Sequence, residues 1–198
     1  MRQWVEYKPF YLTCCSKACG VRDIEDEEID KSEDRTYMTK VEILGENRFE
    51  THTKTREASR AVIVRDGMIQ LIYEAGSDLW VIPGGGIEED ETSEKCCVRE
   101  AEEETGNLVL PLQEFTVLYE YYEEYCYITH YFICEVTGSG RMHLTQAEVH
   151  RGVKPKWIPF NEAMDIFSHH QSYADVSEEK RGIYLREYTA LKEYLKTP

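Results

Sequence analysis

The sequence predicts a mixed α+β fold in which a β-sheet is covered by helices. From residue 37 onward, short apolar runs alternate with turn residues, a pattern typical of strands. Two helical segments, over 92–105 and 178–196, interrupt and then close this series of strands. Hydrophobic residues make up 41% of the 198 residues, and the 14 tyrosines favour strands with aromatic side chains. A sheet with helices packed on it is the arrangement by which such a mixture buries its apolar faces.

The first part of the chain differs from the rest, which predicts an extension over residues 1–35 and a domain over residues 36–198. Its second half carries eight acidic and three basic residues and shows neither helical nor strand periodicity. Its first half is aromatic and contains Cys14, Cys15 and Cys19. These thiols lie close together, but the segment lacks a second pair with the spacing of a zinc knuckle. We therefore do not expect a zinc site there.

Two hairpins are predicted at the start of the domain. The segments 37–44 and 48–55 both have strand character and flank a turn that begins at Gly45. The next two apolar runs flank Asp66-Gly67, which is the strongest short hairpin signal in the chain. We expect each pair of segments to form two antiparallel neighbours in the sheet.

A short buried strand over 79–83 is expected to end at Pro83. Gly84, Gly85 and Gly86 follow it, and they predict a tight turn. Because glycine has no Cβ atom, the backbone there can adopt positive φ angles and approach a ligand closely. A carbonyl group from this turn could therefore join a metal site.

The helix over 92–105 has clear signals at both ends. Asp90 or Thr92 can cap its start, acidic residues occupy its first turn, and Gly106 ends it. Later segments predict a pair of long strands with a turn near 123–124, then a strand, a short helix and a closing amphipathic helix. Their ranges are 114–136, 153–160, 161–167 and 178–196, and the closing helix has Ile183, Leu191 and Leu195 among its apolar positions.

The net charge of −15 arises from 38 acidic and 23 basic residues. Such a chain is repelled by nucleic-acid duplexes and by anionic membranes, so we expect neither as a partner. Phosphate compounds remain accessible where divalent cations separate the two negative partners. The sequence has no apolar run long enough for a membrane span and no apolar leader with a cleavage site. The seven cysteines are odd in number and partly adjacent, which favours reduced thiols and a cytoplasmic location.

Three carboxylates converge on one face of the helix over 92–105. Residues three and four apart share a helix face, so Glu100, Glu103 and Glu104 repel one another, and Arg99 relieves part of this repulsion. One reading is an ordinary solvated helix face. The other reading is a site for Mg²⁺ or Mn²⁺, because hard divalent cations take carboxylate oxygens as ligands.

The residues around this helix resemble the Nudix box, the pattern G-x5-E-x7-R-E-U-x-E-E-x-G-U in which U is a bulky apolar residue. The box covers the 23 residues from Gly85 to Asn107 and is matched in register by Gly85, Glu91, Arg99, Glu100, Glu103, Glu104 and Gly106. Ala101 is small for its U position, and Asn107 stands where an aliphatic residue is usual. The flanking segments also look like Nudix domains, so the resemblance extends over roughly residues 37–198.

The resemblance implies an α/β/α sandwich with a mixed sheet. It also implies hydrolysis of a nucleoside diphosphate linked to another group, with Mg²⁺ or Mn²⁺ as cofactor. The positions Glu100, Glu103 and Glu104 match the metal-binding carboxylates of the family, and the Gly85 carbonyl matches a further ligand. Arg99 matches the arginine that orients the glutamates.

The resemblance leaves the general base open between two carboxylates. Glu103 is the candidate within the box, and Glu148 is the candidate on a loop that precedes the strand over 153–160. For Glu148 an exposed loop residue without a catalytic role is an equally good reading.

The substrate is not specified by the box. Trp80 and Tyr127 are the candidate substrate-binding residues, because aromatic rings can stack on a base, although packing in the core explains most aromatic residues more simply. The expected partner is a small nucleoside diphosphate derivative, together with a second copy of the chain in a homodimer. The alternative function is a nucleotide-binding sensor without activity. Such Nudix domains usually lose box carboxylates, whereas this chain keeps them.

Overall fold

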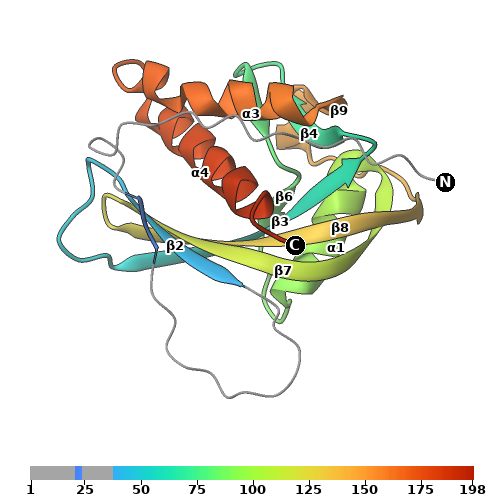
Figure 1. The fold of residues 1–198 in the computed structure, drawn as a ribbon, viewed down its shortest axis with the longest axis horizontal. Coiled ribbons are helices and arrows are strands. Elements are labelled where there is room, and N and C mark those ends of the chain that lie inside the picture. Colours follow the sequence, from blue (N-terminus) through green and yellow to red (C-terminus); the bar gives the residue numbers. More distant parts are fainter. Residues whose placement is uncertain (1–20, 24–37) are drawn as a thin grey trace.

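The computed structural model describes residues 21–23 and 38–198, which form one mixed β-sheet with helices on both faces (Figure 1). The strands are β1 (Val21–Asp23), β2 (Thr39–Leu44), β3 (Lys54–Arg65), β4 (Met68–Glu74), β5 (Leu79–Val81), β6 (Gly84–Gly86), β7 (Asn107–Tyr122), β8 (Tyr125–Ser139) and β9 (Val153–Pro159). The helices are α1 (Ser93–Thr105), α2 (Gln146–Arg151), α3 (Phe160–Ser168), the 3₁₀ helix η1 (His169–Tyr173) and α4 (Glu178–Tyr194). The predicted α+β class is confirmed.

The sheet is built around the long hairpin of β7 and β8. Strand order is β1-β2-β7-β8-β3-β4-β5, with β6 paired to β3 and β9 paired to β4. The pairs β2–β7 and β3–β8 are parallel, and the other pairs are antiparallel. The predicted turn at 123–124 is confirmed, but β7 begins at Asn107, directly after α1, and not at residue 114.

The predicted hairpin of segments 37–44 and 48–55 is wrong. The two segments lie on opposite sides of the β7–β8 hairpin, because β2 pairs with β7 and β3 pairs with β8. The connection between them crosses the tip of that hairpin, where the Phe49 and Thr53 amides donate to the Glu123 and Glu124 carbonyls. The first segment thereby gains the long strand β7 as its partner, which satisfies more backbone groups than a two-stranded hairpin would. Of the second segment only Lys54 and Thr55 are in a strand, the start of β3.

The hairpin at Asp66-Gly67 is confirmed. Both residues have positive φ angles, 52° for Asp66 and 75° for Gly67, which suits the sharp turn between β3 and β4. The three glycines after Pro83, in contrast, do not form a turn. They form β6, which pairs antiparallel with β3. Among them only Gly84 has a positive φ, 147°, and a Cβ atom there would collide with the backbone of β3.

Two cores lie on the two faces of the sheet. On one face α1 packs through Cys97 and Ala101 against β3 and β8. On the other face α3 and α4 cover the larger core (Figure 1). The alternation of β3 divides the two cores, since Ala61 and Ile63 face α1 while Val62 faces α4.

The apolar face predicted for the last helix is only partly correct. Leu191 is fully buried, but Leu195 lies beyond the end of α4 and is 60% exposed. The helix instead buries several charged side chains, among them Arg181 and Glu187. A buried charged residue needs partners, so this face of α4 has a polar environment.

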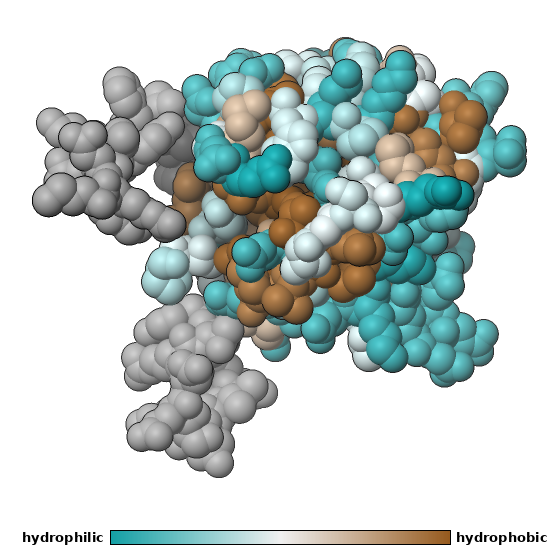
Figure 2. Space-filling model, turned by 90° about the vertical axis from the view of Figure 1, so that its right-hand side faces the viewer, coloured by the Kyte–Doolittle hydropathy of each residue, from teal (hydrophilic) through white to brown (hydrophobic). Residues whose placement is uncertain are grey.

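On the face of the molecule that Figure 2 shows, hydrophobic residues gather in a central area. The exposed large hydrophobic residues of the described chain include Leu108, Leu110 and Leu112, which alternate along the first part of β7. The cysteine cluster predicted not to bind zinc lies outside the described residues. Of the helices in residues 38–198, none is long and apolar enough to cross a membrane.

Candidate active site

Helix α1 presents a row of carboxylates because its ends and its buried side are fixed. The Thr92 hydroxyl accepts a hydrogen bond from the Lys95 amide at 3.3 Å, and Gly106 ends the helix in the left-handed conformation with a φ of 72°. Both predicted caps are therefore confirmed. With Cys97 and Ala101 packed on the sheet, the side that carries the glutamates turns toward β6.

Arg99 connects the loop before α1 with the helix itself. Its Nε and Nη2 atoms both donate to the carboxylate of Glu91 at 2.9 Å, and its Nη1 atom donates to Glu100 at 2.7 Å and to Glu103 at 3.1 Å. Nη2 also donates to the Gly86 carbonyl at 3.1 Å. The guanidinium group lowers the pKa of Glu91 to about 2. A planar guanidinium with five donors suits this multiple role.

Glu100 and Glu104 are the buried members of the carboxylate row. Glu104 is 7% exposed and accepts a hydrogen bond from the Gly84 amide at 2.8 Å. Burial raises the pKa of Glu104 to about 8, against the opposing effects of that amide and of Arg60. Burial also raises the pKa of Glu100, while Arg99 opposes the change. Both carboxylates are therefore costly to ionise without a further positive charge.

Gly85 lies directly against Glu100. A Cβ atom at this position would fall on the Glu100 carboxylate, so only glycine fits while that carboxylate stays in place. The Cys96 thiol, on the same helix, lies 3.5 Å from the Gly85 carbonyl oxygen, which shows that this carbonyl faces α1. The backbone of β6 thus forms one wall of the carboxylate site.

The oxygen atoms of this site fit a hard divalent cation. Glu100, Glu103, Glu104 and the Gly85 carbonyl supply only oxygen ligands, which suit Mg²⁺ or Mn²⁺. Within the described residues, no three acidic, histidine or cysteine side chains already converge as a metal site. The reason is visible in the hydrogen bonds, since Arg99 holds Glu100 and Glu103 and the Gly84 amide holds Glu104. A cation would have to draw these carboxylates together.

Glu148 does not lie on a loop, as expected, but in the short helix α2. Its carboxylate accepts a hydrogen bond from the Thr145 amide at 2.7 Å, and the Thr145 hydroxyl accepts one from the Glu148 amide at 3.3 Å. This reciprocal capping is visible in the sequence as Thr-x-x-Glu and could have revealed the helix. The negative charge of Glu148 contributes to the raised pKa of both Glu100 and Glu104, so Glu148 lies near the carboxylate row.

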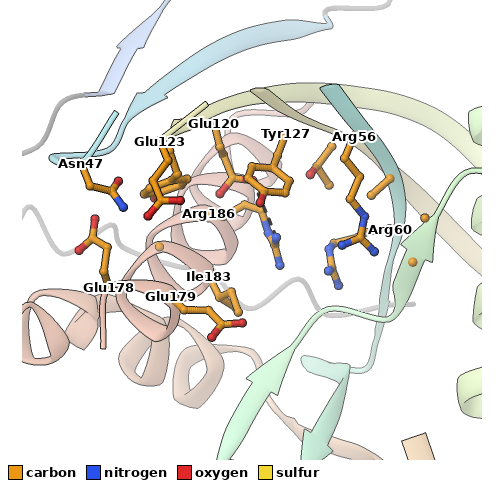
Figure 3. Close-up of a pocket in the computed structure, with 16 residues that line it drawn as sticks. Asn47, Arg56, Arg60, Glu120, Glu123, Tyr127, Glu178, Glu179, Ile183 and Arg186 are labelled. Carbon is orange, nitrogen blue, oxygen red and sulfur yellow. Dashed lines mark ion pairs between the residues drawn. The ribbon is translucent and has the colours of Figure 1, made fainter. Parts of the chain in front are cut away.

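A cavity of about 490 Å³ opens beside β6, between the sheet and α4 (Figure 3). Tyr127 lines this cavity, and its role in substrate binding stays a prediction. Trp80 is not among the lining residues; its ring packs against Tyr73 with a centroid separation of 4.7 Å. The structure therefore places Tyr127 in a cavity that Gly85 and Gly86 also line, and it packs Trp80 against Tyr73.

The charged lining of the cavity was not predicted. Arg56, Arg60 and Arg186 lie toward β6, while Glu123 and Glu178 lie at the opposite end (Figure 3). Glu120 lies between the two groups, is 3% exposed, and has a pKa that burial raises to about 7. An acidic residue among the apolar and aromatic residues of 115–122 was a signal in the sequence that could have identified Glu120.

Comparison with known proteins places these features in a family. A family model described as NUDIX domain matches residues 54–179. A NUDIX hydrolase from Nitrosomonas europaea is similar in structure, with 18% identity, a TM-score of 0.51, and coverage of 72% of this chain and 90% of that one.

Two further solved structures have lower TM-scores. The E. coli ORF135 protein has 24% identity, a TM-score of 0.48, and coverage of 70% and 91% of the two chains. An ADP-ribose pyrophosphatase from Streptococcus suis has 18% identity, a TM-score of 0.43, and coverage of 54% and 75%. A comparison with curated protein sequences found no significant match.

Proposed function

The chain belongs to the NUDIX domain family, and from this premise we propose that it hydrolyses a pyrophosphate bond in a nucleoside diphosphate linked to another group. The observation that supports the proposal most strongly is the row of Glu100, Glu103 and Glu104, complete and placed against the β6 backbone. The cavity beside β6 gives the substrate a place next to that row. A domain that had kept only nucleotide binding would not need three mutually repelling carboxylates.

The proposed cofactor is Mg²⁺ or Mn²⁺, held by the three carboxylates and by the Gly85 carbonyl. When bound, the cation supplies positive charge for the phosphate oxygens and lowers the pKa of the attacking water. Arg99 orients Glu100 and Glu103, and Glu91 fixes Arg99 through two hydrogen bonds. The protein thus contributes the ligands on one face of α1 and a bracing ion pair, and the cation would draw the carboxylates together.

Glu103 is the proposed general base. Its side chain is 39% exposed, which makes it the most accessible of the three box carboxylates to water. Glu148 is the second candidate, because its negative charge contributes to the raised pKa of Glu100 and of Glu104. It lies on the short helix α2. To serve as the base, Glu148 would have to give up its hydrogen bond to the Thr145 amide.

The proposal is tested by a phosphate-release screen with Mg²⁺ and Mn²⁺. The substrates should include nucleoside triphosphates, oxidised deoxynucleotides, nucleotide sugars, ADP-ribose and dinucleoside polyphosphates. We expect metal-dependent turnover of at least one class, and loss of that turnover in Glu103→Gln. Nucleotide binding without any hydrolysis across the panel would favour the sensor function instead.

The proposed setting is the cytoplasm, with a small nucleotide derivative as the partner in the site. We also propose a homodimer, in which the segment before β3 contributes to the contact between copies. Gel filtration against the monomer mass of 23.2 kDa tests this directly, because a single monomeric peak would exclude the dimer.

A further inference from the structure

The residues that line the cavity between α4 and the sheet include several with a buried polar atom that makes no hydrogen bond, although some of these atoms are within ion-pair distance of a charged group. Among the described residues, Glu120 Oε2, Arg186 Nε, Arg60 Nε and the Tyr122 hydroxyl are all buried and make no hydrogen bond. All four residues line the cavity. Leaving a buried polar group unpaired costs free energy, so several such atoms around one space indicate a polar ligand that completes their hydrogen bonds.

Glu120 and Arg186 place an acceptor and a donor next to each other in this cavity. Arg186 Nη1 lies 3.8 Å from Glu120 Oε2, too far for a hydrogen bond, and the Arg186 side chain is held in place through its 2.7 Å bond to Glu187. Glu120 is only 3% exposed, so packing fixes the orientation of its side chain. Figure 3 shows both side chains directed into the cavity.

An aromatic ring stands beside this pair. Tyr127 lies directly across from Glu120 on β8, and Arg56 lies directly across from Tyr127 on β3. The three side chains therefore form one row across the sheet, with the tyrosine in the middle. A ring next to an acceptor and a donor suits a flat heterocycle, which can stack on the ring and form hydrogen bonds along its edge.

The next row of the sheet connects this pocket to the carboxylate site. Two residues further along β8, Thr129 lies across from Ala58, and Ala58 lies across from Gly86. These small residues form a floor that ends at the strand contacted by Arg99. From the strand of Glu120, β7, to β6 the sheet spans three strand separations, about 14 Å. A base, a sugar and a pyrophosphate in extended form can follow such a floor.

We propose, on the basis of the proposed function, that the cavity binds a guanine base, with Arg186 donating to its carbonyl oxygen and Glu120 accepting from its two adjacent N–H groups. Guanine presents an acceptor followed by two donors along one edge, which matches Arg186 followed by the Glu120 carboxylate. Adenine presents an amino donor where Arg186 requires an acceptor, and a ring nitrogen without hydrogen where Glu120 requires a donor. The base then stacks on Tyr127, while Arg56 lies free at the cavity wall for a phosphate group.

The test measures binding of GMP, IMP and AMP to the full chain in EDTA by calorimetry. The absence of divalent metal separates this test from hydrolysis. We expect GMP to bind at least about fivefold more tightly than IMP, because IMP lacks the 2-amino group. AMP should bind more weakly than IMP. Equal dissociation constants for the three nucleotides, or no binding of any, would overturn the proposal, whether or not any variant folds.

Two variants and one control sharpen the result. In Glu120→Gln we expect the preference for GMP over AMP to fall about tenfold, because the amide presents a donor to the 2-amino group. Tyr127→Leu should weaken all three nucleotides to a similar degree. Glu135→Gln, which changes an exposed carboxylate outside the cavity, should leave the ranking unchanged.

The outcome is independent of the proposed hydrolysis. Selective GMP binding in a protein that hydrolyses nothing would support the guanine site and contradict the enzyme. Metal-dependent hydrolysis that is equally efficient for guanine and adenine derivatives would support the enzyme and contradict the guanine site.

Discussion

Glu104 combines burial with a position in the proposed metal site. Its carboxylate is buried beside α1, receives one amide hydrogen bond, and has a pKa of about 8. A residue that is unfavourable in the folded protein and is retained in a complete ligand row is typical of functional sites. The folded protein is less stable with this charge than with a neutral amide of the same shape.

We therefore expect Glu104→Gln to separate activity from stability. The substitution keeps an oxygen for the Gly84 amide but removes a charge from the proposed metal site. Turnover should fall by at least about 100-fold, since several kcal/mol of charge stabilisation depend on the cation. The melting temperature in EDTA should equal or exceed that of the wild type. A variant that loses stability in EDTA while keeping its turnover would contradict both parts.

Glu91 has the opposite electrostatic character, because Arg99 lowers its pKa from an ordinary value of 4.5 to about 2. A lowered pKa means that the ion pair stabilises the fold fully above pH 4.5 and that this contribution is lost as the pH falls through 2. We expect Glu91→Gln to cost about 2 kcal/mol of unfolding free energy at pH 7. The difference from the wild type should shrink steadily between pH 4.5 and 2, as followed by urea unfolding. A difference independent of pH would show that the ion pair is not its source.

Strand β6 offers a test with a matched control, because adjacent glycines in it have different surroundings. A methyl group at Gly85 would displace the Glu100 carboxylate, whereas one at Gly86 would meet the nearest heavy atom, Arg56 Nη2, at an ordinary 3.7 Å. We expect Gly85→Ala to lower kcat/KM by roughly 100-fold with the fold retained, since small displacements of catalytic groups are costly. Gly86→Ala should keep kcat close to that of the wild type, with any effect confined to KM, because Gly86 lines the cavity. Equal kinetic effects of the two substitutions would exclude the proposed role of Gly85.

At the level of elements, local signals were sufficient where local chemistry decides the structure. The caps of α1, the Asp66-Gly67 turn and the register of Arg99 with its glutamates all depend on residues a few positions apart. The pairing of β2 with β7 and of β3 with β8 could not be predicted in the same way. It depends on which distant strand offers more hydrogen bonds, and parallel pairing has no local turn signal.

The cavity was also beyond local prediction. Its lining comes from β3, β6, β7, β8 and α4, so no single segment of sequence contains it. Tyr127 was identified because aromatic residues are plausible in any nucleotide site, but Glu120 and Arg186 were not. Each is a common residue in an unremarkable stretch, and only the register of the sheet brings them together.

For the whole molecule, the position of β1 at one edge of the sheet leads to a prediction for residues 1–35. Strand β1 covers β2, and the order of strands separates it from β6 and the carboxylate site. We expect removal of residues 1–35 to leave kcat/KM unchanged. Association beyond the proposed dimer should increase, because the removal uncovers an edge of the sheet with unpaired backbone groups. Light scattering and steady-state kinetics on the shortened and full chains check the two halves of this prediction. A large loss of kcat/KM would place part of that segment in the catalytic site.

The hydrogen bonds of Arg99 have a consequence for how the protein responds to its surroundings. Glu100 and Glu103 are the same carboxylates that the proposed cation requires, so guanidinium and cation compete for them within one molecule. Such internal competition weakens the apparent affinity for the metal by the fraction of molecules in which the carboxylates are free. The proposed catalytic rate would then rise with the free concentration of the cation over a wider range before it saturates. Because Arg99 competes for these carboxylates, we expect the rate of the proposed hydrolysis to depend on the free concentration of Mg²⁺.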